Sequence, residues 1–547
     1  MTRAIDKLEP FQRAITKAHL ASCGVSIDAL EDPNKPLIVI ANSWNEICPG
    51  HEPLRMLAGE VKKGILEAGG EPVEFNTIAV CDGVAQGHAG MHYSLPSREI
   101  IADSVEAQIM AQNCFDGVVY MGSCDKIVPG MLMAAGRINL PGAIVSAGPC
   151  YDEIKPSDSK ELRARFLRGE ATELEVIEGT LKYYTGPGIC PFLGTANTMC
   201  CLAEGLGMMV PGGALQPAPS AQRRFIARRT GACVVDMVRK GVRVSDIMTQ
   251  AAFDNAVTLL ASIGGSLNAL LHLPAIADEL GCKVTWTQIA ETTSKTPLVC
   301  NVVPNGNISC VNLYKAGGIP AVLKTIEGDL DGSVMTVNGK TMAENLQADI
   351  KIDRSVIRTQ DDPASVANGI QVLYGNLSPE GTLVKTSAVP ADQHTFEGPA
   401  MCFDSEEECF AAYNRHEIAP GTAVIIRYEG PKGGPGMKEL HRVTEIMKGI
   451  PGSAVITDGR FSGASGGLSV GYLCPEAAEG GPIALVRDGD IVHINLAENS
   501  ITFDVSDEEL EERRRTWKPV IHETKSKVLN RYRKQVGPAK TGALLGY

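Results

Sequence analysis

The first third of the chain alternates short apolar runs with segments of helical spacing, and this alternation limits the possible folds more than any other feature. The run at 54–65, for example, places apolar residues at helical spacing. Four runs have the length and apolar content of buried strands: 36–41, 73–80, 117–121 and 143–147. Such alternation predicts an α/β domain built on a parallel sheet. Ligands of such sheets bind at the carboxyl ends of the strands, where the connecting loops meet.

The character of the chain changes within 349–368, where charged residues and the sequence TQDDPAS interrupt the apolar periodicity. Before this stretch, 245–344 has a helical pattern with glycine-rich joints. After it, strand patterns alternate with turn signals, at 424–428, 454–457, 483–486 and 491–505. A chain of 547 residues also exceeds one ordinary core. We therefore expect an α/β domain over 1–355 and a β-rich domain with C-terminal helices over 356–547.

Composition excludes several classes of protein. Acidic residues outnumber basic ones by 64 to 51, so the net charge of -13 has the wrong sign for binding nucleic acid. No stretch approaches about 18 uncharged apolar residues, and the first residues carry charges where a signal peptide is apolar. We expect a cytoplasmic protein with no membrane partner. The 16 cysteines include no C-x-x-C pair, so any metal site must combine distant cysteines.

The strongest local signal for chemistry is Cys124-Asp125-Lys126, which directly follows a predicted buried strand. Asp82 follows the neighbouring predicted strand. Thiolates suit iron or zinc, whereas carboxylates suit Mg²⁺ or Ca²⁺, so the mixture indicates two different inorganic centres side by side. Each residue alone has an ordinary structural interpretation, as a core thiol, a helix cap or an exposed charge. On adjoining loops at the carboxyl ends of strands, they together favour a site.

Two segments partly match a nucleotide-binding motif and a hydrolase motif. VNGKT lacks a P-loop because Val334 replaces its first glycine. A G-x-S-x-G motif at 463–467 makes Ser465 a candidate hydrolase nucleophile, with His493 or His522 as the base. The structural alternative for this motif is a glycine-rich turn.

Six long motifs occur in one order across nearly the whole chain: DGVAQGHAGMHYSLPSREIIADS, GSCDKIVPGM, CPFLGTANTM, GNLSPEG, RYEGPKGGPGMKE and TDGRFSGASGGLSVGYLCPEAA. They resemble the dihydroxy-acid dehydratase and 6-phosphogluconate dehydratase family of hydro-lyases. The resemblance implies an α/β N-terminal domain and a swivelling β-barrel C-terminal domain. It also implies an iron–sulfur cluster, Mg²⁺, and assembly as a homodimer or a dimer of dimers.

The resemblance also implies roles for individual residues outside the cluster. The family's Mg²⁺ ligands match Asp82, Asp125 and Glu439. Lys126 matches a lysine that the family uses as a carbamate, a modification that turns a cation into an oxygen ligand. Ser462 of DGRFSG matches the serine that abstracts the substrate proton.

The cluster ligands match the family only in part. Cys124 and Cys190 fall on ligand positions, but Gly50 of SWNEICPGH stands where members with 2Fe–2S clusters have the cysteine of a P-C-N motif. We expect Cys81 to be the third ligand, because it would adjoin Cys124 on the next loop, with Cys48 as the alternative. Loss of the usual thiolate favours a 4Fe–4S over a 2Fe–2S cluster, with one open iron acting as a Lewis acid.

The resemblance implies dehydration of a small 2,3-dihydroxy acid to a 2-keto acid. YSLPSRE, GGSLNALLHL and RYEGPKGGPGM favour the branch that acts in branched-chain amino-acid biosynthesis. AQG and CPFLGTAN favour a sugar-acid dehydratase, acting on an aldonate or on 6-phosphogluconate. A non-catalytic relative is a further alternative, although every Mg²⁺ position is retained.

Overall fold

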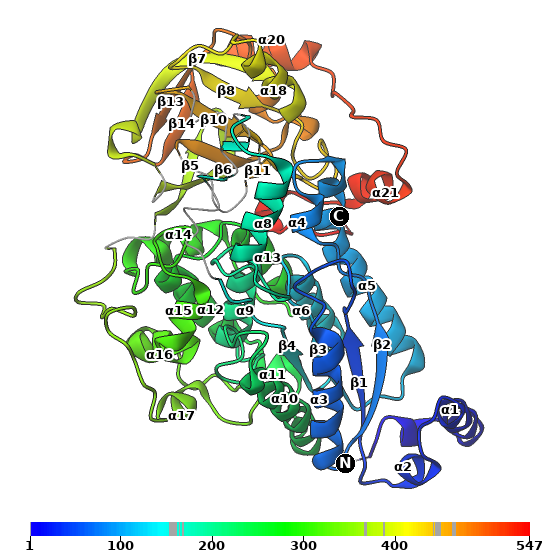
Figure 1. Ribbon diagram of the computed structural model, residues 1–547. Coiled ribbons are helices and arrows are strands. Elements are labelled where there is room, and N and C mark those ends of the chain that lie inside the picture. Colours follow the sequence, from blue (N-terminus) through cyan, green and yellow to red (C-terminus); the bar gives the residue numbers. More distant parts are fainter. Residues whose placement is uncertain are drawn as a thin grey trace.

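The computed structural model describes residues 2–152, 161–162, 165–166, 169–365, 369–386, 389–440, 442–443, 450–461 and 467–546. Figure 1 shows two parts, an α/β part that contains the N-terminus and a barrel on top of it. The parallel sheet precedes the barrel along the chain, as the sequence predicts.

The four predicted strands of the first third form one parallel sheet in the order β2-β1-β3-β4. Their bounds are β1 (Leu37–Asn42), β2 (Glu71–Asn76), β3 (Gly117–Met121) and β4 (Gly142–Val145). The second strand ends at Asn76, earlier than predicted, and the chain then leaves the sheet toward Cys81. β1 lies between β2 and β3, so the loops after β2 and β3 are not immediate neighbours.

The helices that connect these strands lie on both faces of the sheet. The connections β1-α3-β2 and β3-α6-β4 run in opposite directions across the sheet, and right-handed crossovers then place α3 (Leu54–Glu67) and α6 (Ile127–Ile138) on opposite faces. α10 (Ala221–Lys240) packs on α3, and α5 (Ser94–Gln112) packs on α6. The strand order reverses between β1 and β3. Folds of this kind bind ligands in the crevice beside the carboxyl ends of the two strands at which the order reverses.

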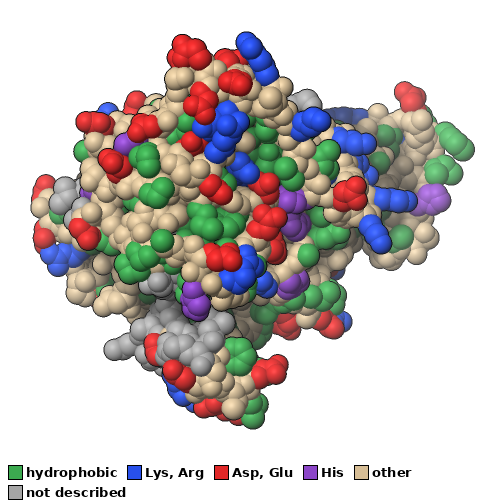
Figure 2. Space-filling model, turned by 90° about the horizontal axis from the view of Figure 1, so that it is seen from above, with side chains coloured by type: hydrophobic (Ala, Val, Ile, Leu, Met, Phe, Trp, Pro, Cys, Tyr) green, Lys and Arg blue, Asp and Glu red, His purple; other side chains and the backbone are tan. Residues whose placement is uncertain are grey.

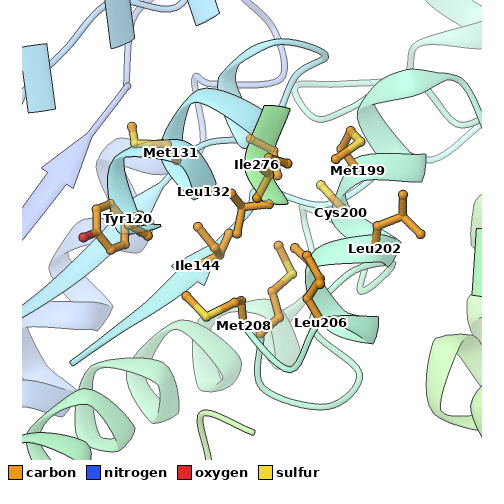
Figure 3. Close-up of a cluster of buried hydrophobic side chains, with 14 of the residues drawn as sticks. Tyr120, Met131, Leu132, Ile144, Met199, Cys200, Leu202, Leu206, Met208 and Ile276 are labelled. Atoms are coloured by element: carbon orange, nitrogen blue, oxygen red, sulfur yellow. The ribbon is translucent and has the colours of Figure 1, made fainter. Parts of the chain in front are cut away.

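A helical layer buries the open side of β4 and α6. α9 (Thr195–Gly205) and α13 (Ala269–Asp278) both contact α6. Figure 3 shows Leu132 of α6 in a cluster of hydrophobic side chains with Ile144, Met199 and Ile276, and all four are buried. Each such side chain contributes about 1.5–3 kcal/mol by leaving water, so this layer anchors the loops above it.

The described N-terminal part has further helices, and those beyond residue 243 confirm the helical pattern that the sequence predicts for 245–344. They are α1 (Pro10–Ser22), α2 (Ile27–Glu31), α4 (Asp82–Ala85), α8 (Glu173–Tyr183), α11 (Val244–Ile247), α12 (Gln250–Ile263), α14 (Trp286–Lys295), α15 (Cys310–Lys315), α16 (Gly318–Thr325) and α17 (Met342–Leu346). Short 3-10 helices are η1 (Ile5–Lys7), η2 (Ala89–Tyr93) and η3 (Glu327–Asp329).

The C-terminal part is a closed eight-stranded barrel of mixed direction, in the order β10-β12-β6-β5-β14-β13-β7-β8. Its strands are β5 (Ile370–Gly375), β6 (Ser378–Lys385), β7 (Thr395–Phe403), β8 (Ala423–Ile426), β10 (Ala454–Thr457), β12 (Ser469–Cys474), β13 (Ile491–Asn495) and β14 (Ser500–Phe503). Two short strands, β9 (Glu439–Leu440) and β11 (Arg460–Phe461), pair beside it. One predicted strand is wrong: 483–486 overlaps the 3-10 helix η8 (Pro482–Leu485). Pro482 at its first position suits a helix and removes a ladder donor.

The end of the chain returns to the α/β part. Among the described residues, α18 (Glu406–Asn414) and α20 (Asp507–Thr516) accompany the barrel, with η5 (Ala391–Gln393) and η7 (Ala477–Glu479). α21 (Lys527–Gln535) packs on α5, and η9 (Ala539–Thr541) contacts α13 and β12. Beyond α21, the backbone oxygens of Gly542 and Ala543 accept hydrogen bonds from the buried Arg98 of α5, at 2.7 and 3.0 Å. The C-terminus therefore ties the two parts of the chain together.

Figure 2 shows the barrel end of the molecule, where acidic and basic side chains are interspersed over the described surface. None of the helices in the described ranges is long and apolar enough to cross a membrane.

Candidate active site

Three carboxylates from both parts of the chain meet at one place. Asp82 begins α4, Asp125 precedes α6, and Glu439 lies on β9 beside the barrel. Their ligand atoms all lie within 4.8 Å of one another. Carboxylate oxygens are the ligands that Mg²⁺ and Ca²⁺ prefer, so the group has the chemistry of a divalent-cation site.

The ammonium group of Lys126 lies among these carboxylates. Its Nζ is 2.6 Å from Asp82 Oδ2, 3.4 Å from Asp125 Oδ2 and 3.3 Å from Glu439 Oε1. Burial and the nearby charge of Arg460 disfavour the ammonium, but the three carboxylates outweigh them and raise the pKa of Lys126. The ammonium occupies the place where a metal ion would neutralise the three carboxylates. This group of ligands therefore fits a divalent metal.

Glu439 is held through one of its two oxygens. Glu439 Oε1 accepts hydrogen bonds from Arg460 at 2.7 Å and from Asn268 at 2.9 Å, in addition to Lys126. The hydroxyl of Tyr472 donates to Asn268 and fixes it in turn. Burial alone would raise the pKa of Glu439, but Lys126 and Arg460 lower it below its usual value. Glu439 is therefore ionised, as a metal ligand must be.

The aspartates differ in their surroundings. Ser94 donates to Asp82 Oδ1 at 2.5 Å and orients that carboxylate. Burial raises the pKa of Asp125 to about 6, with Asp82 and Glu439 adding to the rise and Lys126 opposing it. Crowding like charges in this way is unfavourable without a bound cation, which agrees with a metal site.

A pair of thiols lies next to the carboxylates. Cys48 Sγ is 3.6 Å from the Sγ of Cys124, the residue before Asp125. Cys81 hydrogen-bonds to Cys48, which raises the pKa of the Cys81 thiol. The hydrogen bond from Cys48 favours the thiolate of Cys124, yet burial and nearby negative groups raise its pKa to about 11. A metal centre would supply the charge that makes these thiols thiolates.

The strand order explains which cysteine adjoins Cys124. If β2 and β3 were neighbours, as the chain order alone indicates, Cys81 would lie beside Cys124. In the sheet β1 separates them, so the loop after β1, with Cys48, lies next to the loop with Cys124. Cys81 adjoins Cys48 instead. A Cβ on Gly50 would lie 2.5 Å from Cys124 Sγ, so a larger residue at position 50 would displace that thiol.

Cys190 lies in the loop before α9, and burial raises its pKa to about 12. Asn197 of that helix donates to the backbone oxygen of Cys190 at 2.6 Å and positions the loop. His51 lies within ligand distance of Cys48 and Cys124, but its Nε2 accepts the backbone N–H of Cys124 at 3.1 Å. Burial lowers the pKa of His51 to about 4, so the ring is neutral and can accept this bond. His51 thus orients the Cys124 loop.

The two candidate serines, Ser462 and Ser465, lie outside the described residues. The two histidines considered as bases for Ser465 lie on different elements. His493 lies on β13, 3.0 Å from Asp504, and His522 lies between α20 and α21.

Comparison with known proteins identifies the class. The family described as Dihydroxy-acid/6-phosphogluconate dehydratase matches with its N-terminal profile over residues 35–345 and with its C-terminal profile over 355–543. The chain belongs to this family, and it is therefore an enzyme of the hydro-lyase class, a dehydratase.

Individual relatives are similar over almost their whole length. The chain is 45% identical over 545 residues to a dihydroxy-acid dehydratase of Acetivibrio thermocellus, covering 98% of both chains. It is 44% identical over 548 residues to one of Methanothermobacter thermautotrophicus, again covering 98% of both. A third, from Ignicoccus hospitalis, is 44% identical over 529 residues, 94% of this chain and 95% of that protein.

Several residues that shape the site had no role assigned from sequence. They are Ser94, Asn268, Arg460, Tyr472 and His51. Ser94, Asn268 and Arg460 lie within the motifs YSLPSRE, GGSLNALLHL and TDGRFSG, so their motifs were the only signal. Their contacts depend on tertiary structure, which brings Asn268, for example, to Glu439, 171 residues away.

Proposed function

We propose that this protein dehydrates a 2,3-dihydroxy carboxylic acid to a 2-keto acid in branched-chain amino-acid biosynthesis. Its relatives are named as dihydroxy-acid dehydratases. The observation that supports this proposal most is the group of Asp82, Asp125 and Glu439 around Lys126, next to the Cys48 and Cys124 thiols. A hard-ligand site beside a soft-ligand site provides for both ends of the reaction, loss of the C2 proton and loss of the C3 hydroxyl.

The residues of the metal site have distinct tasks. Asp82, Asp125 and Glu439 would hold Mg²⁺, with Lys126 as a carbamate supplying a further oxygen. Bound Mg²⁺ would supply charge stabilisation for the substrate carboxylate and the 2-hydroxyl. Arg460 and Asn268 keep Glu439 Oε1 occupied, so its second oxygen faces no competing donor in the described part of the chain.

Proton transfer falls to Ser462 by its match to the family motif. Its hydroxyl oxygen would take the proton from substrate C2, and the enol left after loss of the 3-hydroxyl would tautomerise to the 2-keto acid. A neutral hydroxyl is far too weak a base, so positive charge must stabilise its alkoxide. The charge of bound metal would supply this stabilisation.

We propose that Cys48, Cys124 and Cys190 hold an iron–sulfur cluster of the 4Fe–4S type. The 3.6 Å contact with Cys124 favours Cys48 over Cys81 as the third ligand. When bound, such a cluster supplies a Lewis acid for the leaving hydroxyl. The thiols contribute by fixing it beside the carboxylates.

The choice between Cys48 and Cys81 predicts a difference in cluster content. We expect Cys48→Ser, purified without oxygen, to lose most of its iron and sulfide, because it removes a thiolate from the pair. Cys81→Ser should keep most of both. Iron and sulfide analysis with Mössbauer spectra measures this, and the reverse pattern would assign the third position to Cys81. Spectra of a stable 2Fe–2S centre alone would reject the 4Fe–4S type.

Metal removal tests the carboxylate site. Chelation with EDTA should abolish turnover without changing the cluster spectrum, because the oxygen ligands and the thiols form separate groups. Mg²⁺ should restore activity. Full activity after exhaustive chelation would contradict the assigned role of Asp82, Asp125 and Glu439.

We also propose that the protein is cytoplasmic and forms a homodimer or a dimer of dimers. The support is the family resemblance, and light scattering of the purified protein measures the mass directly.

A further inference from the structure

The loop that carries Glu439 into the site is rich in glycine. Residues 428–437, YEGPKGGPGM, connect β8 to β9 and include four glycines among ten residues. Glycine loses more backbone freedom on ordering than any other residue, so such a loop has little intrinsic order. Contacts from outside the loop must therefore fix the position of Glu439.

Two buried carboxylates contact the backbone of this loop. Glu476 accepts hydrogen bonds from the N–H of Lys432, at 3.0 and 3.1 Å to its two oxygens, and from the N–H of Gly433 at 2.9 Å. Asp458 accepts the N–H groups of the first two loop residues, at 3.2 and 2.9 Å. Glu476 is 5% exposed and Asp458 is 1% exposed. Burial raises the pKa of Glu476 to about 8. It also excludes water that would compete for these hydrogen bonds.

Gly430 is shaped to admit the Glu476 carboxylate. A Cβ at this position would lie 2.4 Å from Glu476 Oε2, closer than any real contact. The backbone of Gly430 is not in the left-handed region, so the close approach, not the conformation, requires glycine. The loop sequence and the carboxylate thus fit each other.

The far end of the loop rests on the α/β part. The ring of His92 donates from Nδ1 to the backbone oxygen of Pro435 at 3.0 Å. A Cβ on Gly436 would lie 1.9 Å from the backbone oxygen of His92, so the two backbones are in close contact. Arg460 Nε then donates to the oxygen of Met437 at 2.7 Å, two residues before Glu439. The loop is therefore fixed at its start by carboxylates and at its end by the domain it enters.

We propose that Glu476 is a positioning residue for the divalent-cation site. By accepting the N–H groups of Lys432 and Gly433, it holds the glycine-rich loop in the one conformation that presents Glu439 to Asp82 and Asp125. Glu476 acts through the backbone of the loop. The inference rests on the proposed function, because the cation site is part of that proposal.

Binding of Mn²⁺ to the full-length protein, followed by room-temperature EPR of the free ion, tests this without turnover. We expect Glu476→Ala to weaken Mn²⁺ binding about tenfold, since two backbone donors lose their acceptor. Glu476→Gln keeps one acceptor oxygen and should recover part of the affinity. Gly430→Ala should weaken binding similarly, by displacing the carboxylate from the other side. Both changes disturb the same contact between Glu476 and the loop. The double variant should therefore bind Mn²⁺ only slightly more weakly than either single variant.

Controls separate this inference from the proposal on which it rests. Glu479 is the last residue of the 3-10 helix η7, which Glu476 precedes as the N-cap residue, and it pairs with the half-buried Lys432. Glu479→Ala should therefore bind Mn²⁺ as the wild type does. Glu439→Gln should bind it weakly. If Glu439→Gln binds normally, the cation site is wrong. Suppose that Glu439→Gln binds Mn²⁺ weakly but Glu476→Ala and Gly430→Ala bind it normally, even with lower melting temperatures. Glu476 then contributes only to stability, and the inference fails. Should Glu476→Ala not fold, Gly430→Ala decides alone.

Discussion

Replacing Lys126 with alanine should lower kcat/KM at least about a thousandfold, because the change removes the carbamate that would hold Mg²⁺. Lys126 is fully buried among three carboxylates, so it is not the surface residue that its loop position indicates. In the metal-free protein, where Lys126 is an unmodified ammonium, the variant should also unfold at a lower temperature, since three acidic groups are left facing one another. Steady-state kinetics and thermal melts, with and without Mg²⁺, measure both effects.

Lys126→Arg is the matched control for charge. It keeps a cation among the carboxylates, so its melting temperature should fall less than that of the alanine variant. A guanidinium cannot form the carbamate, and turnover should still be lost. Substantial activity in Lys126→Arg would show that positive charge alone suffices and would reject the carbamate.

The second large effect is expected at Ser462. Ser462→Ala should lower kcat on the order of 10²-fold or more, the loss typical of a positioned proton-transfer group, while cluster and Mg²⁺ binding stay intact. Ser465→Ala should lower kcat far less, because Ser465 has a catalytic role only if the protein is a hydrolase. Kinetics with substrate deuterated at C2 complete the test, since proton abstraction predicts a primary isotope effect when chemistry limits the rate.

The opposite pattern at these serines would reopen the hydrolase hypothesis. In that case Ser465→Ala would be inactive, Ser462→Ala would work normally, and a fluorophosphonate would label the colourless active protein. Labelling followed by mass spectrometry identifies the modified serine directly.

Most of the fold was predictable because periodicity and turn signals are local. The strand 117–121 matches β3, and 454–457 matches β10. The run 483–486 has strand-like composition, yet Pro482 at the first helical position favours the 3-10 helix η8 over most of it. The order of the strands in the sheet is set by tertiary packing. That order decides whether Cys48 or Cys81 adjoins Cys124, and spacing along the chain does not contain it.

The candidate site was predictable to the extent that motifs mark it. Asp82, Asp125 and Glu439 do come together, although Glu439 is more than three hundred residues from the others. The residues that orient them were not assigned, because a hydrogen bond such as Asn268 to Glu439 joins two elements whose packing the sequence does not reveal. The burial of Lys126 was missed for the same reason.

Formation of 2-keto acid by anaerobically purified protein, supplied with Mg²⁺, tests the proposed function most directly. The substrates are 2,3-dihydroxyisovalerate, a set of aldonic acids and 6-phosphogluconate. We expect rapid formation of the keto acid from 2,3-dihydroxyisovalerate, with little from the sugar acids. Preference for an aldonate or for 6-phosphogluconate would contradict the proposed substrate, and no keto acid from any of them, with cluster and Mg²⁺ bound, would contradict the proposed reaction.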